Sequence, residues 1–230
     1  MSDSSAHGKE TRRTARGRGQ RTTRLPPEER KSMLIDKAAD FFAEHGFEAG
    51  TRVLAEEMGI TQPLIYRYFE SKEDLINEVY SDVCVAKWRP EWETTLKDRS
   101  RPLKDRLHDF YHSYCEVVYD RRWVRFFFFA GLKELDINTR YVTRVSERLL
   151  KPICVELRAE LGHPEDAPAI SEEEFELVWL MQAMIFYQAI RAHIYRIRAN
   201  LDPAFAIDTA IEMYLRTAPE IVAKACEAGK

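Results

Sequence analysis

The residues with the clearest chemical potential lie in a short polar and aromatic series between Thr61 and Lys72. Gln62 carries an amide that can read adenine edges, and Pro63 and Leu64 offer apolar contacts, for instance to a thymine methyl. Donors suited to phosphate oxygens accompany them, namely Thr61, Tyr66, Arg67, Tyr68 and Lys72. If these residues share one exposed helix, they predict contact with duplex DNA.

A strongly basic segment precedes this series. Residues 9–24 contain seven Lys or Arg residues against a single acid, although the whole chain carries a net charge of −3. Because residues 1–26 have almost no apolar side chains to bury, we expect them to form a disordered arm. Such an arm, with Arg21 and Arg24 nearest the first expected helix, is typical of polyanion binding. A solvated tail that only aids solubility is the alternative.

A second group with possible chemistry is the pair His108 and His112. Their i, i+4 spacing places both imidazoles on one helix face, with Cys115 a further turn along and Asp105 and Asp109 nearby. Such a set could bind zinc or another divalent metal. No strong metal motif accompanies the pair, and histidines on helices are often ordinary surface or core residues. We therefore assign no metal site from the sequence.

The common signatures of enzymes and of secreted proteins are missing from the sequence. No G-x-G-x-x-G, G-x-x-x-x-G-K or G-x-S-x-G pattern occurs. The four cysteines are far apart, which argues against a disulfide scaffold. The N-terminus has no apolar secretory signal, and no apolar run approaches the roughly 18 residues of a membrane span. We therefore expect a cytoplasmic protein without catalytic residues or a cofactor.

Apolar residues repeat at helical spacing throughout, whereas strand signals are weak, so the sequence predicts an all-α fold. A short helix, a turn at Gly59 and a second short helix form the helix-turn-helix pattern. The capping box that starts at Ser71 opens the helix after them. In the N-terminal part we expect one helix that begins at Pro26-Pro27 and stops at Gly46, and further helices at about 52–58, 62–68 and 71–88.

The polar stretch from Pro90 to Pro102 is interpreted as a boundary between this unit and the rest of the chain. Five helical blocks follow, with a kink expected at Pro152 and an interruption near Pro219. The blocks are 103–120, 122–134, 138–161, 171–198 and 203–227. This gives a basic arm (1–26), a helix-turn-helix DNA-binding domain (27–80) and a helical ligand-binding and dimerisation domain (81–230).

Residues 29–80 resemble the DNA-binding domain of TetR-family transcriptional regulators. The matching residues are Ala38, Ala39, Phe41, Phe42, Gly46 and Phe47, then Leu54, Ala55, Met58, Gly59, Ile60 and Thr61, then Tyr66, Arg67, Tyr68, Phe69, Ser71, Lys72, Glu73, Asp74 and Leu75. The loop before Leu54 is about one residue shorter than the commonest family form. The usual Thr or Ser cap of the second helix therefore maps onto either Gly50 or Thr51, and we assign Thr51 as the cap and as a phosphate contact.

The resemblance implies a homodimer whose last two long helices form a four-helix interface. Two-fold symmetry would then present two reading helices to successive major grooves of a near-palindromic operator, about 34–36 Å apart. The family fold also places the basic arm beside the DNA, along the minor groove or the phosphates. On the last two helical blocks, the residues expected at the interface are Phe175, Val178, Phe186, Ile190, Ile207, Ile211, Tyr214 and Leu215, and the alternative is that these helices are fully buried in the core of a monomer.

The resemblance further implies an effector site in the C-terminal domain. Its walls should be aromatic, so we expect a small apolar or aromatic effector, although core packing is the alternative role for each aromatic residue. The candidate ligand-binding residues are His108, Phe110, Tyr114, Trp123, Phe126, Phe127, Trp179, Gln182, Phe186 and Tyr187.

The leading hypothesis is a repressor that an effector controls through the helix at about 71–88, which joins the two domains. A helical enzyme is a second hypothesis, but no acid, base or nucleophile can be assembled for it. A protein-interaction or nucleoid-type DNA binder without an effector is a third, and it would have a filled interior between residues 103 and 190.

Overall fold

The structure, a computed structural model, describes residues 26–164, 168–197 and 200–228. Within these ranges the chain is helical and contains no strand, which confirms the all-α prediction. The expected DNA contacts Arg21 and Arg24 lie outside the described residues. The helices are α1 (Pro27–His45), α2 (Thr51–Glu57), α3 (Gln62–Tyr66), α4 (Lys72–Tyr80), α5 (Glu91–Lys97), α6 (Leu103–Val118), α7 (Arg121–Leu132), α8 (Asp136–Val145), α9 (Lys151–Glu160), α10 (Glu172–His193) and α11 (Pro203–Ala228).

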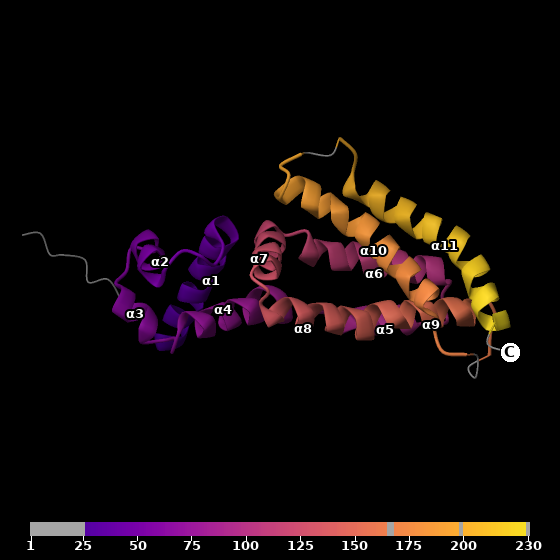
Figure 1. The fold of residues 1–230 in the computed structure, drawn as a ribbon, viewed down its shortest axis with the longest axis horizontal. Coiled ribbons are helices and arrows are strands. Elements are labelled where there is room, and N and C mark those ends of the chain that lie inside the picture. Colours follow the sequence, from indigo (N-terminus) through magenta and orange to yellow (C-terminus); the bar gives the residue numbers. More distant parts are fainter. Residues whose placement is uncertain (1–25, 165–167, 198–199, 229–230) are drawn as a thin grey trace, which may run out of the picture.

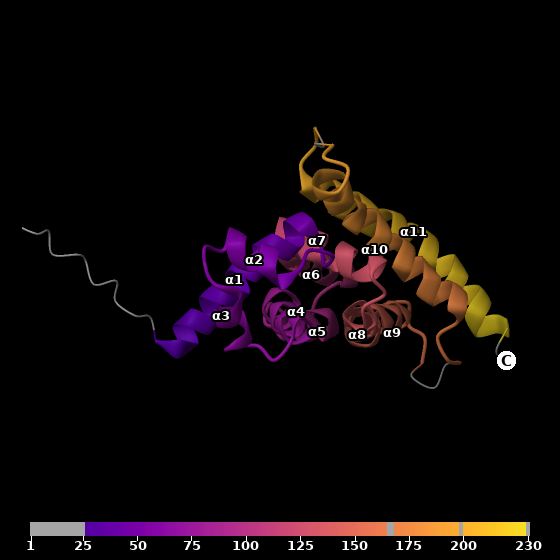
Figure 2. The same cartoon turned by 60° about the vertical axis from the view of Figure 1, so that its left-hand side comes forward.

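The molecule is elongated, with α1, α2 and α3 at one end and the long helices α10 and α11 side by side over the other (Figures 1 and 2). Helix α7 lies between the two ends. A π-helical turn (Ser81–Val85) extends α4, and another (Ser146–Leu150) joins α8 to α9. Among the described residues, no helix combines the length and the apolar character that crossing a membrane requires.

Local sequence explains the N-terminal helices. Pro27 occupies the first turn of α1, where a missing N–H is tolerated, and Gly46 ends the helix with a φ of 69°. Gly59 has a φ of 68° and makes the turn between α2 and α3. Ser71 caps α4 by accepting a hydrogen bond from the Asp74 N–H over 3.0 Å. The expected helix-turn-helix is therefore present.

Two expectations about the later helices were wrong. The stretch from Pro90 to Pro102 contains helix α5, because Trp92 and Leu96 are buried against the rest of the molecule. The last helix is not interrupted at Pro219, since α11 continues through it with Ala218 and Val222 buried on either side. The expected boundary between residues 80 and 81 falls within a continuous helical segment formed by α4 and its π-helical turn.

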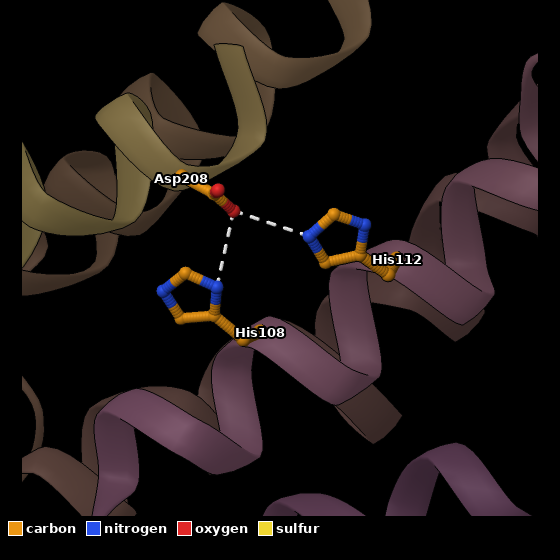
Figure 3. Close-up of side chains that lie close together, drawn as sticks. All are labelled: His108, His112 and Asp208. Carbon is orange, nitrogen blue, oxygen red and sulfur yellow. Dashed lines mark hydrogen bonds and ion pairs between the residues drawn. The ribbon is translucent and has the colours of Figure 1, made fainter. Parts of the chain in front are cut away.

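A polar seam joins α6 to α11. Figure 3 shows His108 and His112 on α6 facing Asp208 on α11. Lys104, one turn before His108, forms an ion pair with Glu212, one turn after Asp208. The two helices are therefore antiparallel along this seam.

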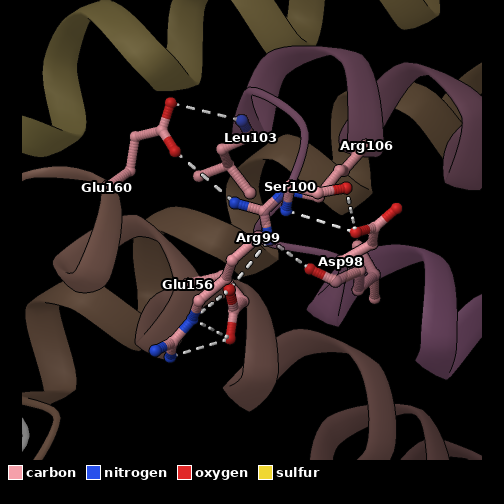
Figure 4. Close-up of polar contacts among 8 residues, drawn as sticks. Asp98, Arg99, Ser100, Leu103, Arg106, Glu156 and Glu160 are labelled. Atoms are coloured by element: carbon pink, nitrogen blue, oxygen red, sulfur yellow. Dashed lines mark hydrogen bonds and ion pairs between the residues drawn. The ribbon is translucent and has the colours of Figure 1, made fainter.

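Two buried ion pairs link helices of the C-terminal half, and Figure 4 shows the one that joins α6 to α9. The fully buried Arg106 donates to Glu156 over 2.8 Å, and Arg99 donates to the same carboxylate over 3.0 Å. Burial opposes ionisation of Glu156, but these hydrogen bonds prevail and lower its pKa. Arg158 and Glu174 make a second buried pair at 2.6 Å between α9 and α10. These pairs thus connect α6 and α10 to α9.

Candidate DNA-reading face and effector cavity

The first turn of α3 forms the exposed face of the helix-turn-helix. Buried Leu54, Ala55 and Ile65 hold α2 against α3. The same geometry leaves Pro63 exposed and Leu64 half-buried, as a base-reading surface requires. Thr61 is the N-cap of α3, but its side chain makes no capping hydrogen bond, and it is exposed.

A polar triad locks this face to α2. The Gln62 Nε2 donates to the Thr51 Oγ1 over 2.8 Å, and the Thr51 hydroxyl lies 2.9 Å from the Tyr66 hydroxyl. The sequence analysis assigned Thr51 as the cap of α2, and this assignment was wrong. Gly50 is the N-cap, and the Thr51 side chain is buried and engaged in the triad. Base reading by Gln62 would thus require its amide to leave Thr51 or to use its other atoms.

The remaining candidate DNA contacts, Arg67, Tyr68 and Lys72, differ in exposure and in the contacts that they make. Arg67 is exposed and makes no ion pair or hydrogen bond with another described side chain, so its guanidinium can reach a phosphate. Tyr68 is half-buried. Lys72 donates from its Nζ to the Phe47 carbonyl oxygen and so holds α4 against the end of α1. Lys72 therefore has a structural contact of its own, and its role at phosphate remains a prediction.

A cavity of about 320 Å³ lies between α6, α7, α8 and α10. This volume is at the lower end of the range for small-molecule sites. Of the predicted ligand-binding residues, those that line it are Tyr114, Trp123, Phe127, Trp179, Gln182, Phe186 and Tyr187. The other lining residues are Tyr141, Val142, Val145, Ala183 and Ile190.

Three predicted ligand-binding residues lie elsewhere. His108 faces Asp208 on the α6–α11 seam. Phe110 is buried against the Trp92 ring of α5, with centroids 6.4 Å apart. Phe126 packs edge-on against Phe47 of the DNA-binding unit, with centroids 5.2 Å apart. Sequence periodicity identified these aromatic faces as apolar but could not say which neighbour each would meet.

Sequence reasoning missed the α8 wall of the cavity. Tyr141, Val142 and Val145 recur at helical spacing within a polar helix, which was the available signal. Ile190 was expected at the dimer interface and lines the cavity instead. Phe186, expected in both places, also lines the cavity and packs edge-on against Trp123 at 5.7 Å.

Few polar atoms interrupt the apolar cavity wall. The Gln182 Oε1 and the Trp123 Nε1 are buried and have no hydrogen-bond partner among the described residues. The hydroxyls of Tyr114 and Tyr141 lie 3.5 Å apart. Burial raises the pKa of both hydroxyls, so both stay protonated at neutral pH. The cavity therefore suits an uncharged apolar or aromatic group with a polar atom that can satisfy Gln182 or Trp123.

The expected dimer residues divide into two sets. Val178, Ile207, Ile211 and Tyr214 are at most 3% exposed, because α10 and α11 bury them within their own subunit. Within one subunit these four residues therefore belong to the core, and their part in an interface stays a prediction. Phe175 and Leu215 are half-buried. The outward apolar face of the two helices consists instead of Leu180, Met184, Phe205 and Met213, which are 37–57% exposed.

Comparison with known proteins identifies the family of the N-terminal helix-turn-helix unit. The family model for bacterial regulatory proteins of the tetR family matches residues 34–79, the segment from α1 into α4. The helix-turn-helix unit is a tetR-family domain. Its similarity to the transcriptional activator FasR of Mycolicibacterium smegmatis is 33% identity over 89 residues, or 37% of this chain and 41% of FasR. The transcriptional repressor KstR2 of Rhodococcus jostii is 41% identical over 75 residues, or 31% of this chain and 37% of KstR2.

These matches span about two fifths of the length of either relative. The fold extends further than the sequence similarity. A TetR-like regulator from Rhodococcus sp. RHA1 is 19% identical but covers 87% of this chain and 99% of its own, with a TM-score of 0.59. The SmeT repressor of Stenotrophomonas maltophilia covers 81% of this chain and 88% of its own at 18% identity and a TM-score of 0.58. These similarities show that the TetR-like fold continues through the C-terminal helices.

Helix α7 contributes side chains to both the cavity and the contact with α1. Trp123 and Phe127 point into the cavity and stack on each other at 4.9 Å. On the side facing α1, Arg122 donates to Asp36 over 2.6 Å and to Asp40 over 2.8 Å. One helix of twelve residues therefore connects the cavity directly to the DNA-binding unit.

Proposed function

We propose that this chain is a DNA-binding transcriptional regulator that binds a near-palindromic operator as a homodimer and is released by a small apolar or aromatic effector. The observation that carries the proposal is α7, which contributes Trp123 and Phe127 to the cavity and Arg122 to α1 of the helix-turn-helix unit. Repressor action follows the naming of the relative KstR2.

The exposed first turn of α3 supports the DNA contact. Gln62, Pro63 and Leu64 would meet the base edges of a major groove, and Arg67 a phosphate. The basic arm would add phosphate contacts, each of which steepens the salt dependence of binding by roughly one unit of log–log slope. DNA binding would place the protein in the cytoplasm, where bacterial operators are.

The outward face of α10 and α11 supports the homodimer. Leu180, Met184, Phe205 and Met213 are large apolar side chains that these two adjacent helices leave exposed to solvent, and an exposed apolar surface of this kind often marks an interaction site. Pairing α10 and α11 of two subunits would bury these side chains in a four-helix contact. The two α3 helices would then face the same side of a duplex.

Effector control would follow from linkage between the two sites. A ligand shifts a conformational equilibrium only by its differential affinity for the two states. A ligand wedged against Trp123 and Phe127 would favour the α7 position that best fits it, and Arg122 would transmit that position to α1. Helix α4, with its π-helical turn, is the second connection between the halves. Movement of α7 and α4 would together change the distance between the α3 helices of the two subunits.

The alternative functions fit the geometry less well. A binder without an effector would have a filled interior, whereas this chain has a cavity of about 320 Å³. An enzyme would need a general base in the cavity, but its titratable side chains are tyrosines such as Tyr114, whose pKa burial raises further. The family model and the named relatives likewise describe regulators.

The direct test is operator selection from a random duplex library, followed by fluorescence anisotropy on the selected site. Arg67→Ala should weaken binding and lower the salt slope by about one unit. Arg148→Ala removes an exposed arginine remote from α3 and should change neither quantity. Deletion of residues 1–24 should lower the slope further.

A melting-shift screen against apolar and aromatic metabolites tests the effector, because only a ligand of the folded state stabilises it. Selection of no inverted repeat over random duplex would overturn the proposed function.

A further inference from the structure

The seam between α6 and α11 brings together three side chains that neither DNA nor the cavity uses. His108 Nδ1 lies 3.0 Å from Asp208 Oδ1, and His112 Nε2 lies 3.1 Å from the same oxygen (Figure 3). One ligand atom from each residue falls within 4.8 Å of the others. We propose that these three side chains bind one divalent ion of a first-row transition metal, with Zn²⁺ as the probe.

The donor set selects this class of ion. Two imidazoles and a carboxylate suit zinc, nickel, copper or iron, whereas magnesium and calcium prefer oxygen ligands. Three protein ligands leave further coordination positions for water. The side chains of His112 and Asp208 are 44% and 46% exposed, so a hydrated ion can reach them from solvent.

The separations between the carboxylate oxygen and the two ring nitrogens are already close to those between ligand atoms around a bound zinc ion. Zinc–nitrogen and zinc–oxygen bonds of about 2.0–2.2 Å place neighbouring ligand atoms of a tetrahedral site roughly 3.4 Å apart. The observed separations of 3.0 and 3.1 Å from the carboxylate oxygen differ from that by a few tenths of an ångström. The two rings are nearly parallel, with an interplanar angle of 20°, so small rotations would aim both nitrogens at one point.

The surroundings do not compete for the ligand atoms. Asp208 is the ion-pair partner of both rings, and the other nitrogen of His108, Nε2, is buried without a partner among the described residues. The ammonium of Lys104, one turn away, is neutralised by Glu212 and would not repel a cation strongly. The four cysteines are buried and do not offer a rival surface site.

Metal binding would join α11 to α6, the helix that also supplies Tyr114 to the cavity wall. Local spacing in the sequence singles out the two histidines but not their third ligand, because Asp208 follows about a hundred residues later. The companions suggested by sequence proximity do not take part. Cys115 is buried, and Asp109 forms an ion pair with Arg101 at 2.7 Å.

The test uses the untagged full chain, freed of metal with a chelator and titrated with Zn²⁺ in a calorimeter. We expect one equivalent to bind with a Kd of about 1 µM or tighter and to raise the melting temperature, while Mg²⁺ does neither. His112→Gln and Asp208→Asn should each weaken Zn²⁺ binding at least about 100-fold, since each removes a direct ligand. Neither change alters side-chain size enough to unfold the chain.

His45→Gln is the matched control. His45 also pairs with a carboxylate, Glu57, at 3.1 Å and is similarly exposed, but it has no third ligand. This variant should bind Zn²⁺ like the wild type. The proposal is overturned if the wild type binds no Zn²⁺ saturably at micromolar concentrations. It is also overturned if His112→Gln and Asp208→Asn, with unchanged helical content, retain the affinity of the wild type.

Discussion

Gln182 offers a sharp test of the cavity as a ligand site. Its Oε1 is buried with no hydrogen-bond partner among the described residues. An unsatisfied buried acceptor destabilises a fold by about 1–3 kcal/mol. Gln182→Met removes this acceptor and preserves an unbranched side chain of similar length. We therefore expect a net gain of about 1 kcal/mol.

That gain corresponds to a rise of about 2–4 °C in the melting temperature of a chain of this size. Differential scanning calorimetry and urea denaturation would measure it. Gln188→Met changes a half-buried residue on the same helix, outside the cavity, and should alter stability by less than about 0.5 kcal/mol. The stabilised variant should also lose affinity for any effector whose polar group pairs with the amide.

A different outcome would refute the reasoning. If Gln182→Met melts at or below the wild-type temperature while Gln188→Met is neutral, the amide oxygen is already satisfied in solution. The cavity would then contain an ordered polar group at this position rather than a wall that awaits one.

The remaining predictions concern two glycines with positive φ, one buried ion pair and the proposed dimer interface. Gly46→Ala should lower stability by about 2 kcal/mol or more, because a positive φ of 69° is unfavourable for alanine and the new Cβ would lie 2.8 Å from a ring atom of α7. Gly59→Ala, at a φ of 68° with no neighbouring atom within 4 Å, should lose only about 1 kcal/mol in the same urea titration. Arg158→Met should reduce stability at pH 7 by about 3 kcal/mol, because it leaves the Glu174 carboxylate buried and unpaired. Hydrogen bonds from that arginine lower the pKa of Glu174 against the opposing effect of burial, so the difference from wild type should shrink as the pH falls below the ordinary value of 4.5; a pH-independent deficit would contradict this. Met213→Asp should convert the proposed homodimer to monomer in light scattering at micromolar concentration, whereas an Asp on the exposed side of α9 should not.

The DNA-binding unit was predictable because its signals are local. The glycines at 46 and 59, the cap at Ser71 and the apolar spacing of Leu54 and Ile65 each act within a few residues of the structure they specify. The helix-turn-helix and the exposed position of Pro63 follow directly. The Thr51 assignment was wrong because Gly50 serves as cap, which leaves the Thr51 hydroxyl free to join Gln62 and Tyr66.

Other features depend on long-range packing, which periodicity does not specify. Helix α5 has only Trp92 and Leu96 to mark it in a polar stretch, and its partners lie on α6 and α9. Helix α10 is apolar on nearly every side, so its pattern cannot tell the inward Val178 from the outward Leu180. The proline at 219 would break an isolated helix, but the buried residues around it hold α11 in one piece.

Helix α7 both lines the cavity and contacts α1, which matters for any redesign of this chain as a biosensor. Substitutions at Trp123 or Phe127 would reshape the binding site and disturb the docking of the DNA-binding unit together, so altered selectivity would come with altered basal output. The opposite wall offers a cleaner route. Val142, Val145 and Ala183 line the cavity from α8 and α10. Libraries restricted to these three positions should change which compound binds while leaving the output in the absence of ligand unchanged.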